Sequence, residues 1–439
     1  MSQQIDKLVE KKVKAIQNGE NVYEIGRVTK ADGYVLEVDG LSGVGFFERV
    51  RIADKAEGYV TDIRRNSISV ALVKTNGEVY IGDTVTRTQE EFSGLFCEKS
   101  VGHIVDMFGK DLMSGEYFDE LVELPIETKP IPIMDRTSVK RPFLTGVTGI
   151  DMIYPIGRGQ RQLILGDKKT GKTQLCLDAI VNQKDEKMLC IYVAVGKTKK
   201  DVKEVYTELL KRGAMDNTLI LAAFNDECPP VLRNTPYVGV AIAEYMMMKY
   251  AIDVCVVIDD LKKHADVCRE IALLTGKVPG RDAYPSDIFY THASLLEHGC
   301  QHKNGGSVTI LPIVETKSGD ITEYIASNVI SITDGQIVLS QKNFEKGFKP
   351  AIDYGLSVSR LGGAVQTPTM KKVGATVRRE LLSYLESCEI YELANMDEMG
   401  PELKKRMETG KKVRNLLKQY KFSPLTQQEM LGMFDGLFD

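Results

Sequence analysis

The segment from Gly166 to Thr173 leaves few folds open to this chain of 439 residues. Its sequence, GDKKTGKT, is a glycine, four variable residues and then Gly-Lys-Thr. The apolar run Gln162 to Leu165 precedes it, and a helix-like run, Gln174 to Asn182, follows it. A glycine-rich loop between a strand and a helix predicts a P-loop, in which backbone N–H groups and the helix N-terminus bind phosphate.

A P-loop predicts a site for a nucleoside triphosphate such as ATP. Lys172 is expected to reach the β and γ phosphates, and the Thr173 hydroxyl to bind Mg²⁺. The expected nucleotide-binding residues of the loop are Gly166, Asp167, Lys168, Lys169, Thr170, Gly171, Lys172 and Thr173. The motif predicts binding and leaves hydrolysis undecided.

A second segment supports the first. The apolar run that begins at Asp253 ends in two carboxylates, Asp259 and Asp260, which is the form of a Walker B strand. We expect Asp259 to hold a water of the Mg²⁺ shell, because hard cations prefer oxygen ligands. Thr173 and Asp259 are therefore the expected metal residues.

The group that would activate water for hydrolysis is missing from its expected place. In a sheet of this class, it stands at the end of the strand that follows the P-loop helix. Here that strand, Cys190 to Val195, is followed by Gly196 and Lys197. A charged lysine cannot act as a general base, so we favour a catalytically silent site. The alternative is a base from elsewhere, for example Glu227 or Glu315.

The alternation of elements predicts a multi-domain α/β chain. Short alternating runs separated by glycine turns, among them Tyr34 to Val38, Ser67 to Val73 and Val79 to Ile81, predict a small β-barrel. Continuous apolar runs then alternate with helical stretches, which is typical of a buried parallel sheet. The expected core strands are Gln162 to Leu165, Met188 to Val193, Thr218 to Ala223, Val254 to Ile258 and Ser307 to Ile313. The expected domains are an N-terminal helix (1–22), the barrel (23–92), the nucleotide-binding domain (93–369) and a helical C-terminal domain (370–439).

Composition excludes several classes of protein. Lys and Arg total 57 against 61 Asp and Glu, which argues against a dedicated nucleic-acid binder. The eight cysteines include no CxxC pair, which is typical of a reduced, cytosolic protein. His298, Cys300 and His302 are expected to lie in a solvated loop rather than to bind a metal. The first residues do not form a signal peptide and no apolar run is long enough to span a membrane, so we expect membrane association only through partners.

Four further segments carry a resemblance to a known family. They are Pro155 to Arg161, Gly280 to Asp287, Asn328 to Gln336 and Gly355 to Arg360. Over roughly residues 5 to 430 the chain resembles the alpha subunit of the F-type rotary ATP synthase, in a divergent and C-terminally shortened form. In that family the segment from Asn328 corresponds to a recognisable strand and turn.

The resemblance implies a central RecA-like domain in a ring of six subunits, within an ATP synthase or an ATP-driven rotary complex. This chain would alternate with a catalytic beta-type subunit around a central gamma-type shaft, with stator contact through the N-terminal helix. Its own site would bind MgATP without splitting it, and position 197 is normally Gln in the family. Arg360 would project into the neighbour's catalytic site as an arginine finger, with Ser357 supporting it and Ser331 near that interface.

The resemblance also implies an adenine pocket and a location. Phe344 and Gln419 match residues around the base, whereas Lys421 stands for a second glutamine and Lys349 for an arginine. The protein would lie in the cytoplasm, peripheral at the inner face of the cell membrane, and be coupled to proton transport or to another rotary load.

Two alternatives remain. A Rho-like hexameric RNA translocase shares the Gly-Arg-Gly-Gln-Arg lead into its P-loop, and it predicts aromatic and basic RNA-facing residues in the barrel, where this chain has Phe46 and Phe47. A catalytic ring-forming export ATPase predicts a carboxylate at position 197, where this chain has lysine.

Overall fold

The structure is a computed structural model that describes residues 25–391 and 401–437. The N-terminal helix expected within residues 1–22 lies outside the described residues. The chain divides into two compact units. One comprises residues 1–93, 228–231 and 269–278, and the other comprises residues 94–227, 232–268 and 279–439. The domain boundaries expected at residues 22, 92 and 369 stay predictions.

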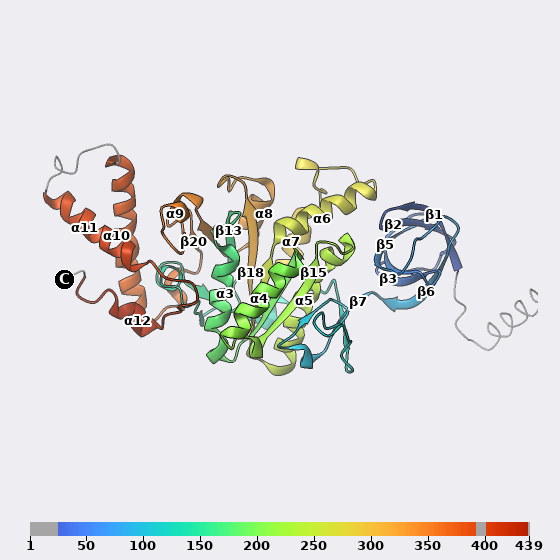
Figure 1. The fold of residues 1–439 in the computed structure, drawn as a ribbon, viewed down its shortest axis with the longest axis horizontal. Coiled ribbons are helices and arrows are strands. Elements are labelled where there is room, and N and C mark those ends of the chain that lie inside the picture. Colours follow the sequence, from blue (N-terminus) through green and yellow to red (C-terminus); the bar gives the residue numbers. More distant parts are fainter. Residues whose placement is uncertain (1–24, 392–400, 438–439) are drawn as a thin grey trace, which may run out of the picture. The chain divides into compact units, whose positions relative to one another are not determined.

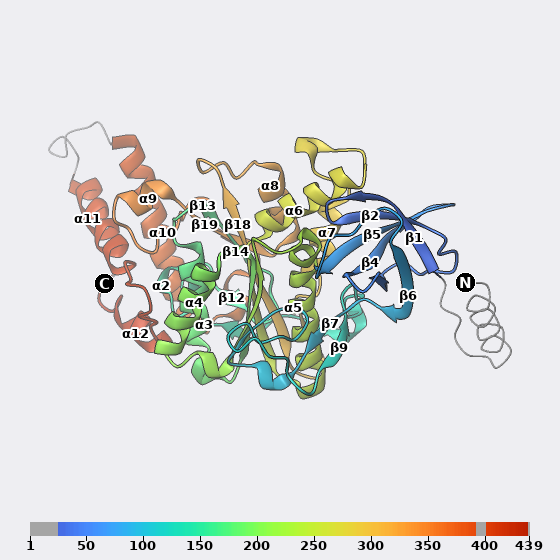
Figure 2. The ribbon, with the colours of Figure 1, turned by 45° about the vertical axis from the view of Figure 1, so that its right-hand side comes forward.

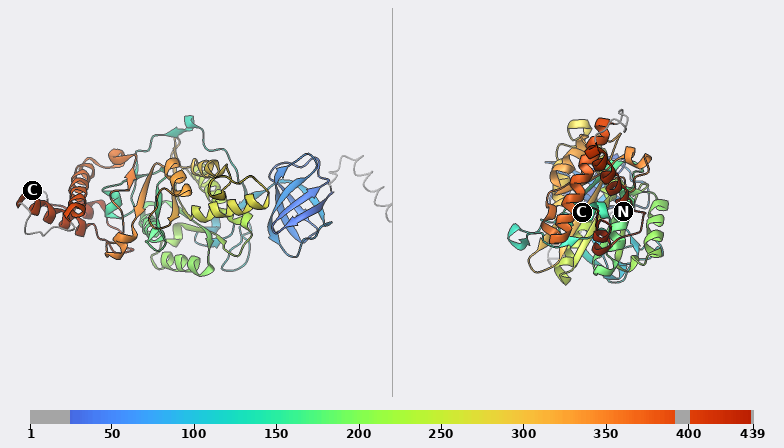
Figure 3. Two further views of the ribbon diagram at one scale, coloured as in Figure 1. Left: turned by 90° about the horizontal axis from the view of Figure 1, so that it is seen from above. Right: turned by 90° about the vertical axis from the view of Figure 1, so that its left-hand side faces the viewer.

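Six strands of the first unit close into the predicted barrel, in the order β1-β2-β5-β4-β3-β6 (Figure 3, left, in blue). They are β1 (Ile25–Asp32), β2 (Val35–Asp39), β3 (Glu48–Ile52), β4 (Ala56–Ile63), β5 (Ile68–Thr75) and β6 (Thr84–Glu91). Val28, Val38 and Val50 are buried in its interior because alternate residues of a strand face the same side. Gly33 turns the chain between β1 and β2 with a positive φ of 61°, a conformation that glycine adopts readily.

The strand expected at Val79 to Ile81 is wrong. The Asp83 carboxylate accepts the N–H of Tyr80 at 2.9 Å, and the N–H of Asp83 donates to the Tyr80 carbonyl at 3.1 Å. These two bonds form a turn just before β6, so the three residues enter no ladder. Tyr80 and Ile81 are consequently 58% and 71% exposed.

The aromatic pair of the barrel is divided between interior and surface. Phe47 is 6% exposed and stacks on Tyr59, with 5.0 Å between ring centroids. Tyr59 in turn stacks on Phe92 at 4.6 Å. Phe46 alone remains exposed, so the pair forms no continuous aromatic surface.

The second unit is built on a sheet whose main path runs β20-β19-β13-β18-β16-β14-β15-β8. Figure 2 labels β13, β14, β18 and β19 of this sheet. The strands of this path are β8 (Ile104–Val105), β13 (Leu163–Asp167), β14 (Leu189–Lys197), β15 (Thr218–Phe224), β16 (Asp253–Asp259), β18 (Ser307–Thr316), β19 (Gly335–Leu339) and β20 (Val358–Ser359). All neighbouring pairs are parallel except β19 and β20. The five core strands expected from the sequence are present, with slightly different ends. This arrangement brings the carboxyl ends of β13, β14, β16 and β18 to one edge of the sheet.

Helices bury the two faces of the sheet. Ile164, Tyr192 and Leu311 on one face share a buried cluster with Leu175 of α3 and Leu209 of α4. The longer helices are α3 (Lys172–Asn182), α4 (Lys199–Lys211), α5 (Pro229–Tyr250), α6 (Leu261–Leu274), α7 (Ile288–Leu296), α8 (Tyr324–Ile332), α10 (Pro368–Tyr391) and α11 (Pro401–Leu416). With the shorter α12 (Gln427–Gly432), α10 and α11 form the expected helical C-terminal region (Figure 1, in red). None of the described helices has the length and apolarity needed to cross a lipid bilayer.

The expectation of a strand and turn over Asn328 to Gln336 needs correction. Residues up to Ile332 are the end of helix α8, and the strand β19 begins only at Gly335. The helix forms because Ile325 and Val329, four residues apart, fall on one helical face and are both buried.

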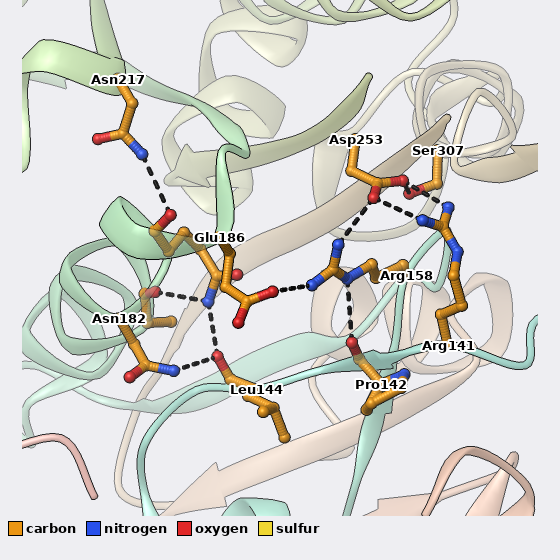
Figure 4. A network of polar contacts seen from close by, with 11 residues as sticks. Arg141, Pro142, Leu144, Arg158, Asn182, Glu186, Asn217, Asp253 and Ser307 are labelled. Atoms are coloured by element: carbon orange, nitrogen blue, oxygen red, sulfur yellow. Dashed lines mark hydrogen bonds and ion pairs between the residues drawn. The ribbon is translucent and has the colours of Figure 1, made fainter. Parts of the chain in front are cut away.

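An ion network closes the opposite edge of the sheet, where β16 and β18 begin (Figure 4). The Asp253 carboxylate accepts hydrogen bonds from Arg141 at 2.6 and 2.8 Å, from Arg158 at 2.8 Å and from Ser307 at 2.7 Å. Arg158 also donates to Glu186 at 2.6 Å. Burial alone would raise the pKa of Asp253, but these hydrogen bonds lower it below its ordinary value. Arg158, in the segment that leads into the P-loop, thus has a structural role in this chain.

Candidate nucleotide-binding site

The loop from Gly166 to Thr173 connects β13 to α3, as the motif predicts. Gly171 immediately precedes the helix with a φ of 100°, which favours glycine. A side chain at Gly166 would meet the backbone oxygen of Leu339 on the neighbouring strand at 2.5 Å. The two glycines therefore allow the loop to curl closely against the sheet and leave the first N–H groups of α3 free for an anion.

Lys172 lies folded against its own loop. Its Nζ donates to the carbonyls of Gly166 at 2.8 Å and Asp167 at 2.7 Å. Burial lowers the pKa of Lys172, and the carboxylates of Glu315, Asp260 and Asp259 oppose that shift. The ammonium group is thus placed at the loop, where it can exchange two carbonyls for phosphate oxygens.

The other loop side chains are arranged around Asp167. Its carboxylate accepts hydrogen bonds from the Thr316 hydroxyl at 2.6 Å and from the Gly319 N–H at 2.8 Å, and its carbonyl accepts one from Thr170 at 2.8 Å. Lys168 and Lys169 are exposed. Asp167 and Thr170 therefore shape the loop, whereas the two lysines add positive charge outside it.

Asp259 ends β16 beside the P-loop, with 1% of its surface exposed. Its Oδ2 accepts hydrogen bonds from the Thr173 hydroxyl at 2.7 Å and the Tyr192 hydroxyl at 2.8 Å. Its Oδ1 forms an ion pair with Lys197 Nζ at 2.6 Å. Thr173 and Asp259 are thus brought together as expected, and Tyr192 and Lys197 join them because β14 lies next to β16.

Lys197 is the last residue of β14 and carries a stable charge. Burial alone would lower its pKa, but Asp259 and Asp260 raise it above the ordinary lysine value. Asp260 is half-buried, and desolvation together with the adjacent Asp259 raises its pKa to about 6. At neutral pH the end of this strand therefore carries a cation that is paired with the Asp259 carboxylate.

The two acids considered as relocated bases differ in their surroundings. Glu315 stands beside Gly166 in the pairing of β18 with β13 and acts on the charges of Lys172 and Lys197. The Glu227 carboxylate instead accepts the N–H of Phe224 at 3.1 Å. Of the two, only Glu315 has contacts that relate it to the P-loop.

The donor set expected for Mg²⁺ fits that ion in part. The pairing of the Thr173 hydroxyl with Asp259 is compatible with a metal bound at the threonine oxygen. However, Lys197 holds the Asp259 oxygen that would bind water of the metal's shell, and its charge repels a divalent cation. Magnesium at this site stays a prediction. The observed site differs from the expected one by the ammonium group of Lys197, which is bound to Asp259.

A cavity of about 590 Å³ opens beside the P-loop and brings the expected base-binding residues together. Its lining includes Gly171, Phe344, Lys349, Gln419 and Lys421. Lys349 Nζ lies 4.7 Å from the centroid of the Phe344 ring, close enough for a cation–π contact. The cavity combines an aromatic face with positive charge, which suits a nucleotide base joined to phosphates.

The amide of Gln419 is engaged within the protein. Its Oε1 accepts the N–H of Thr148 at 3.0 Å, and its Nε2 donates to the carbonyls of Gly146 and Ser423, each at 2.6 Å. Gln419 thus fixes the wall of the cavity, and a role in contacting the base stays a prediction.

Arg360 and Ser357 lie away from this cavity's lining, on the segment that forms β20. Ser357 is 1% exposed, and its hydroxyl donates to the Asp353 carbonyl at 2.6 Å and accepts the N–H of Val338 at 3.0 Å. Arg360 is exposed, and its guanidinium makes a single long contact, 3.4 Å, with the Ile330 carbonyl. Among the described residues no carboxylate pairs with it, so the charge is available to another molecule.

The sequence identified the loop residues and Asp259 but assigned no role to two neighbours. Tyr192 stands in an apolar run and looked like a core residue. Asp260 was visible as the second member of the carboxylate pair, but its half-buried position and raised pKa depend on the packing of the sheet edge.

Comparisons with known proteins agree with this geometry. Residues 146–359 match the model of the ATP synthase alpha/beta family, nucleotide-binding domain. The chain is 39% identical over 439 residues to ATP synthase subunit alpha of Macrococcus caseolyticus, covering 99% of this chain and 87% of that protein. It is 40% identical over 412 residues to ATP synthase subunit alpha of Mesomycoplasma hyopneumoniae, covering 93% and 81%, and 39% identical over 441 residues to that of Limosilactobacillus fermentum, covering 99% and 85%. The chain, with its barrel, its P-loop sheet and its C-terminal helices, belongs to the family of ATP synthase alpha subunits.

Proposed function

We propose that this chain binds ATP without splitting it and acts as the non-catalytic alpha-type subunit of a rotary ATPase ring. The observation that carries the proposal is the ion pair between Lys197 and Asp259 at 2.6 Å. It places a charged lysine at the strand end where hydrolysis requires a group that activates water. A lysine whose pKa is raised cannot accept the proton of that water at neutral pH.

The same proposal gives Arg360 a function in the neighbouring subunit. Its exposed guanidinium has no ionic partner within the described residues, and the buried Ser357 hydroxyl anchors the segment that carries it. A guanidinium delivered across a subunit interface can stabilise the charge that develops on a transferring phosphoryl group. We propose that Arg360 acts in this way on a catalytic beta-type subunit.

The remaining parts of the assembly follow from the family. We propose an alternating ring with the beta-type subunit around a gamma-type shaft, with stator contact through the N-terminal helix. Membrane attachment at the cytoplasmic face would occur through partner subunits, and the load would be proton transport or another rotary task. The nucleotide is held by the P-loop and by the cavity around Phe344, with Thr173 and Asp259 as the residues nearest to any metal.

The RNA-translocase alternative receives no comparable support. It predicts an aromatic surface on the barrel, and of the expected pair only Phe46 is exposed, because Phe47 is buried in a stack with Tyr59 and Phe92. An acidic balance of charge over the whole chain also argues against it.

The test compares the isolated chain with the mixed ring. The isolated chain should bind ATP and show no turnover that depends on Lys172. In the ring, Arg360→Ala should lower turnover by about 10³-fold or more, because arginine fingers contribute that much to phosphoryl transfer. Ring assembly and ATP binding to this chain should not change.

Arg406→Ala is a suitable control, because Arg406 is an exposed arginine on α11 outside the proposed machinery. Full turnover in the Arg360→Ala ring, or Lys172-dependent hydrolysis by the isolated chain, would contradict the proposal.

A further inference from the structure

The ammonium of Lys197 occupies a fixed position beside the P-loop. Its strand ends there, and the next residue, Thr198, caps helix α4 through reciprocal hydrogen bonds with Asp201. Gly196, with a φ of 63°, precedes it in a conformation that favours glycine. The backbone is thus held in place on both sides of Lys197, and the Lys197 side chain bridges the end of β14 and Asp259.

The Lys197 side chain also borders open space next to Thr173, the last residue of the P-loop motif. Lys197, Thr173, Tyr192 and Asp259 line a cavity of about 320 Å³. The Lys197 side chain is 26% exposed, whereas that of Asp259 is 1% exposed. Of the two partners of this ion pair, the ammonium is therefore the one that another molecule can reach.

The ammonium satisfies the contacts that a metal and its waters would make. It holds Asp259 Oδ1, while the hydroxyls of Thr173 and Tyr192 both bond to Oδ2. Together with Lys172, it balances part of the charge of Asp259, Asp260 and Glu315, the three carboxylates that act on both lysines. A divalent cation placed here would face an ammonium of the same sign at close range.

We propose that Lys197 takes the place of the divalent cation, so that this P-loop binds ATP in the absence of Mg²⁺. This inference rests on the proposed function, since it concerns the same nucleotide site. Lys197 provides a charge-assisted hydrogen bond to the terminal phosphates, alongside the one from Lys172. No reaction step is involved, because the nucleotide remains intact.

The experiment measures ATP binding to the isolated full chain by calorimetry, with Mg²⁺ and with excess EDTA. For the wild-type chain, the two dissociation constants should agree within about threefold, since a protein cation replaces the metal. For Lys197→Gln, removal of the metal should weaken binding by about tenfold or more, because the neutral amide leaves the phosphates without that counter-charge.

Lys200→Gln is the matched control. Lys200 is exposed on the first turn of α4, three residues from Lys197, and its replacement removes the same charge. This variant should behave like the wild-type chain under both conditions.

A second readout does not depend on a variant. ATP and magnesium are counted in the wild-type chain after free ligand has been removed by gel filtration. We expect bound nucleotide with far less than one magnesium per nucleotide. One magnesium for each nucleotide, or loss of wild-type binding in EDTA by tenfold or more, would overturn this inference and leave the proposed function intact. No binding of ATP under either condition would overturn both.

Discussion

The Ser357 hydroxyl lies 3.0 Å from the backbone nitrogen of Val338 and 2.6 Å from the carbonyl oxygen of Asp353, with 1% of the residue exposed. It therefore connects the segment before β20 to the strand β19. Arg360 follows three residues later with an exposed guanidinium. The position of this arginine thus depends on a small buried hydroxyl rather than on an ion pair of its own.

Ser357→Ala should lower both the stability of the chain and the turnover of the ring. Removal of the hydroxyl leaves the buried N–H of Val338 without its acceptor, which costs about 1–3 kcal/mol in the free energy of unfolding. Because Arg360 loses its anchored segment, turnover should fall while ATP binding to this chain stays the same. Denaturant unfolding and steady-state turnover measure the two effects.

Ser387→Ala is the control for Ser357→Ala, since the Ser387 hydroxyl only donates back to Ser383 within helix α10. Its effect on stability should be within about 0.5 kcal/mol. If Ser357→Ala behaves like this control in both measurements, Ser357 does not position Arg360.

Lys172→Ala should weaken ATP binding to this chain by about 10- to 100-fold, the value of one charge-assisted hydrogen bond to phosphate. The folded state should change little, because the partners lost are two loop carbonyls at 2.7 and 2.8 Å. Calorimetric titration of the isolated chain with ATP measures the change. Lys184→Ala, at an exposed lysine after α3, is the control, and equal affinities for the two variants would argue against a phosphate contact.

Arg158 forms ion pairs with two carboxylates, and we expect their removal to lower the free energy of unfolding by very different amounts. Asp253, whose side chain is 10% exposed, pairs with both Arg158 and Arg141. Asp253→Ala leaves both arginines without this acid and should cost about 3–5 kcal/mol in the free energy of unfolding. Glu186, whose side chain is 44% exposed, holds the same Arg158, and Glu186→Ala should cost about 0–1 kcal/mol. Similar denaturation midpoints for the two variants would show that burial of the pair is not decisive.

Two buried histidines predict a loss of stability in acid. His264 Nδ1 lies 3.2 Å from His292 Nε2, and His264 Nε2 lies 3.0 Å from the Arg233 carbonyl. Burial lowers the pKa of His292 to about 4, and burial with the charges of His292 and Arg233 lowers the pKa of His264. The unfolded chain binds these protons near pH 6.5 and the folded chain does not, so stability is present above that pH and is lost as the pH falls toward 4.

His292→Gln should therefore remove about 2 kcal/mol of the change in unfolding free energy between pH 7 and pH 5. The comparison with the wild-type chain is necessary because Asp151, whose pKa burial raises to about 6, acts in the opposite direction. Denaturant unfolding at the two pH values gives both slopes. Parallel slopes would mean that His292 does not titrate differently in the two states.

The sequence by itself determined the P-loop, the five core strands, the barrel and the family. These features are local, because a strand or a helix is encoded by the period of its apolar residues and a turn by its glycines. It did not determine the turn at Val79 to Ile81. There the Asp83 carboxylate accepts the N–H of Tyr80 and forms a turn, although the β-branched residues favour a strand.

Only the tertiary structure decided which side chains surround the nucleotide site. In the sequence, Lys197 only marked the position where a general base was expected and is missing. Its contact with Asp259 arises because β14 and β16 are neighbours in the sheet although they are far apart in the chain. The Tyr192 hydroxyl donates to the same carboxylate for the same reason. The Ser357 hydroxyl accepts the N–H of Val338, which belongs to a different segment of the chain. Such partners depend on the order of strands and on burial, which set the distance between charges and therefore the strength of each contact.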